Sequence, residues 1–212
     1  MNNYGQLPKV IGEYNISCDE MLYYQYLPIK LKNQIKPVFE ERLNCFNSII
    51  GAACCDFIGE YGLDLYNDSY IYLTAKKMYQ SNGCSFNRHG YHSDGFMTED
   101  INYIWCDNNP TIFNYTQFNL SLDDKKSLIE MQKQADDKKT KVYNINTLLR
   151  LDQYNIHKVN DNKSLCLRTF AKISFSKDKY DLIGNSNNYL LDYKWNMRSR
   201  NIDRNIPQKL NT

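Results

Sequence analysis

This chain has little of what would assign it to a broad functional class. Its 26 Lys and Arg are nearly balanced by 24 Asp and Glu, so the net charge of +2 gives no argument for nucleic acid or a membrane surface. No apolar run approaches the ~20 residues of a membrane-spanning helix, and the N-terminus lacks the basic and apolar regions of a signal peptide. We therefore expect a soluble, cytoplasmic protein without a membrane partner.

The cysteines also lack a recognisable pattern. There are seven, an odd number, and no two of them form a CxxC pair. This usage favours reduced, mostly buried thiols in a reducing compartment over a disulfide framework.

The chain contains neither an internal repeat nor a linker rich in Pro, Gly or Ser, and its 212 residues suit one domain. We expect a helical support over residues 1–67, a core of strands over 68–176 and a C-terminal extension over 177–212. Helices are predicted at 19–27, ended by Pro28, and after Pro37. The second carries an apolar stripe at steps of three and four residues. The stripe consists of Phe39, Leu43, Phe46, Ile50, Ala53 and Phe57.

Short β-branched and aromatic runs separated by turn residues follow, which favours an antiparallel sandwich or barrel. Strands are predicted at 69–75, 101–105, 110–113, 116–120, 147–151, 153–159 and 165–176, interrupted by a polar helix at about 123–135. The fold class is therefore mainly β with N-terminal helices.

Histidine is scarce, with three in the whole chain, and two of them carry the most specific pattern. In His92-Ser93-Asp94, alternation along a strand would place His92 and Asp94 on one face. His157 lies on a later predicted strand, where a lone histidine is ordinarily a core residue. Together, two imidazoles and one carboxylate are the set that holds Fe(II) on one face and leaves the other open.

Arg168 adds a fourth element, because a charged side chain in the strand-like run 165–176 needs a partner if it points inward. The separation in sequence between His157 and Arg168 suits a turn at 160–163 between two adjacent antiparallel strands. A guanidinium there would supply a two-pronged clamp for a carboxylate.

The order HxD, a distal His and an Arg eleven residues after that His resembles the Fe(II)- and 2-oxoglutarate-dependent dioxygenase superfamily, over about residues 70–176. The resemblance implies a double-stranded β-helix core of the jelly-roll or cupin type. It also implies Fe(II) on His92, Asp94 and His157, and 2-oxoglutarate on Arg168. The expected reaction is hydroxylation by molecular oxygen with release of succinate and CO2.

Further residues are expected to complete such a site. Tyr103 and Ser174, with Asn155 as a further candidate, would orient the ligands and the 2-oxoglutarate. Loops beside a metal commonly carry substrate contacts. The residues predicted for that role are Asn87, His89, Tyr91 and Phe96, although an exposed loop position is the simpler interpretation of His89. Asp100 is a spare carboxylate that would replace Asp94 if the register were misread.

Two rival interpretations stay open at this stage. One is a catalytically silent β-sandwich that binds a protein or nucleic acid partner. The other is a cupin-like metalloenzyme that does not use 2-oxoglutarate and so does not need Arg168. The substrate class and the oligomeric state are equally open, since no motif distinguishes a small molecule from a protein or nucleic acid substrate.

Overall fold

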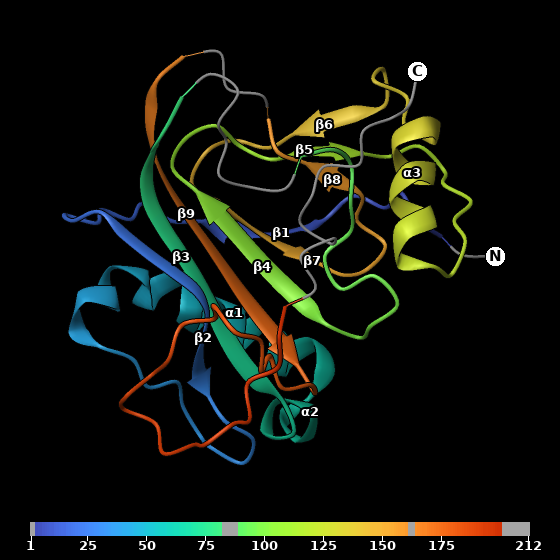
Figure 1. The fold of residues 1–212 in the computed structure, drawn as a ribbon. Helices are drawn as coiled ribbons and strands as arrows, with labels where there is room; N and C mark the ends of the chain where they lie inside the picture. Colours follow the sequence, from blue (N-terminus) through green and yellow to red (C-terminus); the bar gives the residue numbers. More distant parts are fainter. Residues whose placement is uncertain (1–2, 82–88, 161–163, 201–212) are drawn as a thin grey trace.

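The computed structural model describes residues 3–81, 89–160 and 164–200. Within these ranges the chain is mainly β, with a six-stranded and a three-stranded sheet whose paired strands are all antiparallel (Figure 1). The large sheet has the order β1-β7-β4-β9-β3-β2, and the small sheet has the order β6-β5-β8. No helix among the described residues is long and apolar enough to cross a membrane.

The large sheet consists of β1 (Lys9–Glu13), β2 (Leu22–Lys30), β3 (Tyr70–Gln80), β4 (Ile101–Cys106), β7 (Thr147–Leu151) and β9 (Cys166–Ser176). The small sheet consists of β5 (Ile112–Asn114), β6 (Thr140–Val142) and β8 (His157–Lys158). The helical elements are the 3-10 helix η1 (Glu41–Phe46) and the α-helices α1 (Asn47–Tyr61), α2 (Leu63–Asn67) and α3 (Asp124–Gln134).

The main hydrophobic core lies between one face of the large sheet and the helices η1 and α1. The predicted apolar stripe is confirmed, because Leu43, Phe46 and Phe57 are buried against the sheet. From β9, alternation sends Ala171, Ile173 and Phe175 into this core. The helical periodicity of the sequence therefore identified the face that α1 buries.

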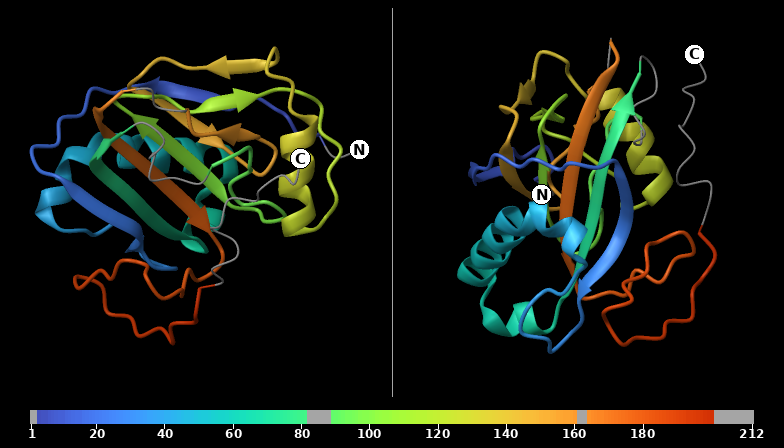
Figure 2. Two further views of the ribbon diagram at one scale, coloured as in Figure 1. Left: turned by 45° about the horizontal axis from the view of Figure 1, so that its top comes forward. Right: turned by 90° about the vertical axis from the view of Figure 1, so that its left-hand side faces the viewer.

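The opposite face of the large sheet packs against the small sheet. Ile104 and Leu149 from the large sheet meet Phe113 from β5 in a second buried cluster, with Phe170 of β9 packed against it. The predicted polar helix is confirmed as α3, which lies beside the small sheet and buries Met131 (Figures 1 and 2). The space between the sheets is therefore where inward-facing side chains of β9 meet β8.

The N-terminal region differs from its prediction. Residues 1–67 provide the two edge strands of the large sheet as well as helices, because the predicted helix at 19–27 is the strand β2. Pro28 within it is tolerated because an edge strand leaves one side of its backbone without a ladder partner. Residues 116–120 do not form the predicted strand, although Phe118 makes an isolated bridge to Tyr4, and the strand predicted at 153–159 shortens to β8.

The cysteine prediction is wrong for one pair. Cys18 and Cys45 form a disulfide, with their Cα atoms 5.7 Å apart. The two residues are 27 positions apart in sequence, so only the packing of the segment before β2 on η1 brings them together. Among the other described cysteines, Cys54, Cys55 and Cys106 are free thiols.

The C-terminal segment after β9 runs back along β2 (Figures 1 and 2). The side-chain amide of Asn188 donates to the carbonyl oxygens of Pro28 and Val38, and the Ser186 hydroxyl accepts from the backbone N–H of Gln25. Trp195 packs edge-on against Tyr70.

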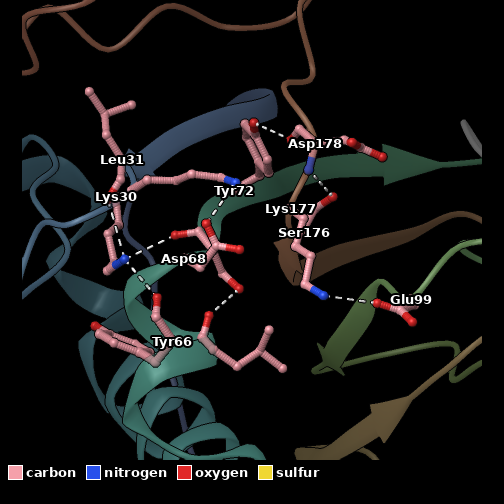
Figure 3. Close-up of polar contacts among 12 residues, drawn as sticks. Lys30, Leu31, Tyr66, Asp68, Tyr72, Glu99, Ser176, Lys177 and Asp178 are labelled. Carbon is pink, nitrogen blue, oxygen red and sulfur yellow. Dashed lines mark hydrogen bonds and ion pairs between the residues drawn. The ribbon is translucent and has the colours of Figure 1, made fainter.

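A fully buried lysine joins β2 to the end of α2. The Lys30 ammonium donates to the carbonyl oxygens of Tyr66 and Ser69, both at 2.9 Å, and to that of Leu31 at 3.2 Å (Figure 3). The carbonyls of Tyr66 and Ser69 lie at or just after the C-terminus of α2, where a cation is favoured. Burial is the main cause that lowers the pKa of Lys30 to about 8.

This lysine predicts a pH-dependent contribution to stability. Between about pH 8 and pH 10 the unfolded chain keeps a proton on Lys30 that the folded chain releases, so Lys30 makes the protein more stable as pH rises. The difference in free energy of unfolding between wild type and Lys30→Met should therefore move in favour of wild type across this window. Urea unfolding at several pH values measures it, with Lys177→Met at an exposed lysine as the control. A difference that stays constant would show that Lys30 titrates like an ordinary lysine.

Candidate metal centre

His92, Asp94 and His157 come together in the folded chain. Each offers one ligand atom, and these atoms all lie within 4.8 Å of one another. The Nε2 atom of His157 is 3.8 Å from Oδ2 of Asp94, and the two imidazole centroids are 4.6 Å apart. Both histidines are largely buried, with 9% and 5% of their surface exposed. The structure thus gathers the ligand set that the sequence predicted.

Backbone hydrogen bonds hold the two histidines opposite each other. The N–H of His92 donates to the carbonyl of His157, and the N–H of His157 donates back, both at 2.9 Å. This isolated bridge replaces the regular strand predicted around His92. Asp94 follows in a turn, where Gly95 has φ +73° and a side chain would collide with Thr98.

Carbonyl oxygens determine which nitrogen of each imidazole is available. Nδ1 of His92 lies 3.0 Å from the carbonyl oxygen of Gly90, and Nδ1 of His157 lies 3.0 Å from that of Asn155. A carbonyl only accepts, so each Nδ1 carries the proton and each Nε2 presents a lone pair. Asn155, a candidate for orienting the ligands, contacts His157 through its backbone, while its side chain bonds to Gln6 and Asp152.

Lys172 lies directly against this group, and the sequence prediction missed it. Its Nζ atom is 3.1 Å from Oδ2 of Asp94 and 3.3 Å from the hydroxyl of Tyr26. The signal was present, because Lys172 shares the alternation of Arg168 along β9 and is another charged residue in a buried strand.

These charges set the protonation states of the site. Burial opposes ionisation of Asp94, but Lys172, His157 and His92 outweigh it and hold the pKa of this carboxyl well below its usual range. Burial lowers the pKa of His157, although the charge of Asp94 acts in the opposite direction. At neutral pH the site therefore offers an ionised carboxylate and a neutral His157 imidazole, which are the states that bind a divalent metal.

Arg168 is buried, with 4% of its surface exposed, on the same face of β9 as Lys172. Its Nε donates to the carbonyl oxygen of Asn108 at 2.8 Å, and its guanidinium lies 4.9 Å from the ring of Phe170. β8 and β9 are not the paired neighbours expected from the turn between them: they belong to the two opposite sheets. His157 and the face of β9 that carries Arg168 therefore approach from opposite sheets.

The structure does not bring Tyr103 to this site. Its hydroxyl donates to Asp56 of α1 at 2.9 Å, on the other face of the large sheet. Tyr103 pairs with Ile173, and paired residues of an antiparallel ladder point to the same side. Ser174 shares the face of Lys172, where its hydroxyl donates to the side-chain oxygen of Asn102 at 2.6 Å.

The residues predicted to contact substrate have different locations. His89 is an exposed loop residue, as its simpler interpretation expected. Tyr91 and Phe96 are buried in a cluster with apolar residues around α3. Asn87 lies outside the described residues. Asp100 accepts a hydrogen bond from the hydroxyl of Tyr180 at 2.7 Å. The carboxylate that lies with the two histidines is that of Asp94, not Asp100.

Comparison with known proteins gives little further information. No family model matches the chain, and no curated protein matches it. Among solved structures, the crystal structure of EvdO2 from Micromonospora carbonacea var. aurantiaca complexed with 2-oxoglutarate is similar over 66% of this chain and 68% of that one. Its sequence identity is 10% and its TM-score is 0.40.

Proposed function

We propose that this protein is an Fe(II)- and 2-oxoglutarate-dependent oxygenase. The proposed reaction is hydroxylation of a substrate with release of succinate and CO2. The observation that carries the proposal is the buried group of His92, Asp94 and His157, held between two antiparallel sheets. The two-sheet arrangement supports a core of the double-stranded β-helix type.

The donor set fits Fe(II). Two Nε2 lone pairs and one carboxylate oxygen form a three-ligand set that suits this ion and leaves coordination positions for other ligands. When bound, the iron would supply the activation of molecular oxygen. The carbonyls of Gly90 and Asn155 orient the imidazoles, and the antiparallel bridge fixes their separation.

Arg168 is the proposed partner of the distal carboxylate of 2-oxoglutarate. The contact from its Nε to the carbonyl of Asn108 fixes the plane of the guanidinium, and stacking near Phe170 supports that plane from one side. A buried, oriented guanidinium binds a carboxylate more strongly than a flexible surface charge does.

The proposal predicts a spectroscopic signature. Anaerobic addition of Fe(II) and 2-oxoglutarate to the wild-type protein should give a weak visible charge-transfer band, and His92→Ala should abolish it. Admission of oxygen should then yield succinate. A folded wild-type protein without the band would contradict the iron assignment and favour the silent β-sandwich.

A second variant separates the cupin-like alternative. Arg168→Met should weaken 2-oxoglutarate binding by about 10-fold or more, because a charged hydrogen-bond partner is lost, while Mn(II) binding stays within about threefold. Tyr103→Phe, on the opposite face of the sheet, is the matched control and should leave both affinities unchanged. An enzyme that does not use 2-oxoglutarate would show no difference between these two variants.

A further inference from the structure

Tyr26 in β2 has a strained backbone and contacts Lys172, which lies beside the candidate metal centre. Tyr26 has φ +48°, a left-handed conformation that is unfavourable for a bulky side chain, and it lies where the register of β2 and β3 shifts between Tyr24 and Leu27. Its backbone N–H donates to the hydroxyl of Thr74 at 3.0 Å. Bulges of this kind redirect side chains and are common beside functional sites.

The redirected ring of Tyr26 meets Lys172. The Lys172 ammonium is 5.0 Å from the ring centroid, in addition to its contact with the tyrosine hydroxyl. On its other side Tyr26 packs edge-on against Tyr180, with ring centroids 5.1 Å apart. The Tyr180 hydroxyl in turn donates a hydrogen bond to the carboxylate of Asp100. Three separate segments of the chain thus fix the surroundings of one ammonium group.

Cations are concentrated on this face of the large sheet. Lys172 and Arg168 lie on the same face of β9, as does Phe170 between them. Lys76 pairs with Phe170 on the neighbouring strand β3, so all three cations point to the same side of the sheet. Burial, together with the nearby charges of Lys172 and Arg168, lowers the pKa of Lys76 to about 8. Such a concentration of positive charge favours an anion.

We propose that Lys172 and Tyr26 bind a carboxylate group of the substrate, which makes the substrate a carboxylic acid. This inference rests on the proposed function, in which Asp94 binds the metal and Arg168 binds the cosubstrate. A metal ion bound to Asp94 would be neutralised by the carboxylate that otherwise neutralises Lys172. The largely buried Lys172 ammonium would then require another anion. Lys172 would exchange the carboxylate of Asp94 for that of the substrate, while the Tyr26 hydroxyl donates to the same group.

Mn(II) affinity measures this exchange without turnover. Manganese binding is followed by electron paramagnetic resonance in wild type and Lys172→Met, with sodium acetate as the probe carboxylate. Acetamide with sodium chloride at equal ionic strength is the neutral comparison. Each titration is run with and without saturating 2-oxoglutarate, and Lys177→Met is the matched control at an exposed lysine–carboxylate pair.

In wild type, acetate should tighten Mn(II) binding by about 10-fold and acetamide should not, because acetate releases Asp94 from Lys172. Without acetate, Lys172→Met should bind Mn(II) about 10-fold more tightly than wild type does, and acetate should not change its Mn(II) affinity. An equal acetate effect in Lys172→Met, or none in wild type, overturns the proposal. An effect that disappears with 2-oxoglutarate assigns the carboxylate to the cosubstrate and overturns the substrate assignment. Failure of wild type to bind Mn(II) at all would instead contradict the proposed function.

Discussion

Replacing Asp94 with asparagine should lower the free energy of unfolding by about 2 kcal/mol and weaken Mn(II) binding by at least about 100-fold. The stability is lost because the Lys172 ammonium, 3.1 Å away, would keep its buried position without its carboxylate. The loss is smaller than for a fully buried pair, since the Asp94 side chain is 23% exposed. Chemical unfolding and manganese titration measure the two effects separately.

The double variant Asp94→Asn/Lys172→Met distinguishes the two roles of Asp94. Removing both charges should restore most of the lost stability, because no unpaired ion remains between the sheets. Metal binding should stay lost, because the third ligand is still missing. If the double variant were as unstable as Asp94→Asn alone, the ion pair would not be the cause of the destabilisation.

Replacing Phe175 with alanine should cost about 3–5 kcal/mol of unfolding free energy, which is the usual cost of removing a buried phenylalanine. Phe175 is 1% exposed at the centre of the main core. Its ring stacks on Phe57 of α1 with centroids 4.2 Å apart, and Tyr103 meets it edge-on at 5.6 Å. Equilibrium urea unfolding of both proteins measures the cost.

The exposed Leu122, with 69% of its surface accessible, provides the control, and Leu122→Ala should change stability by less than about 0.5 kcal/mol. Phe175→Leu is a milder variant that keeps enough stability for metal titration. Because Phe175 and Lys172 occupy opposite faces of β9, its Mn(II) affinity should match wild type. A loss below about 1 kcal/mol for Phe175→Ala would mean that α1 is not held mainly by this contact.

Local patterns in the sequence predicted the elements whose residues carry their own periodicity. The apolar stripe ending at Phe57 identified the buried face of α1, and the β-branched and aromatic runs identified β3, β4 and β9. The residues 19–27 were misassigned as a helix because nothing local distinguishes an edge strand that contains a bulge and a proline.

The candidate site was predicted only in part, for a related reason. Residue types and their order identified His92, Asp94 and His157, because few side chains bind Fe(II). Tyr103 was assigned to the wrong side, since the face of a buried strand depends on which neighbours cover each side. Lys172 was missed although the alternation of β9 placed it on the face of Arg168, since its contact with Asp94 exists only in the folded chain. Tyr26 was missed because its position depends on a bulge in β2.

The sequence by itself determined that this is a mainly β chain with a scarce set of residues that could hold a metal ion. Periodicity and side-chain chemistry are properties of neighbouring residues, and they persist whatever the chain packs against. Only the tertiary structure decided that β8 and β9 lie in opposite sheets, that Cys18 bonds to Cys45, and that Lys172 neutralises Asp94. Those three facts depend on contacts between distant segments, which form only when burial of both faces of the large sheet fixes the register of its strands.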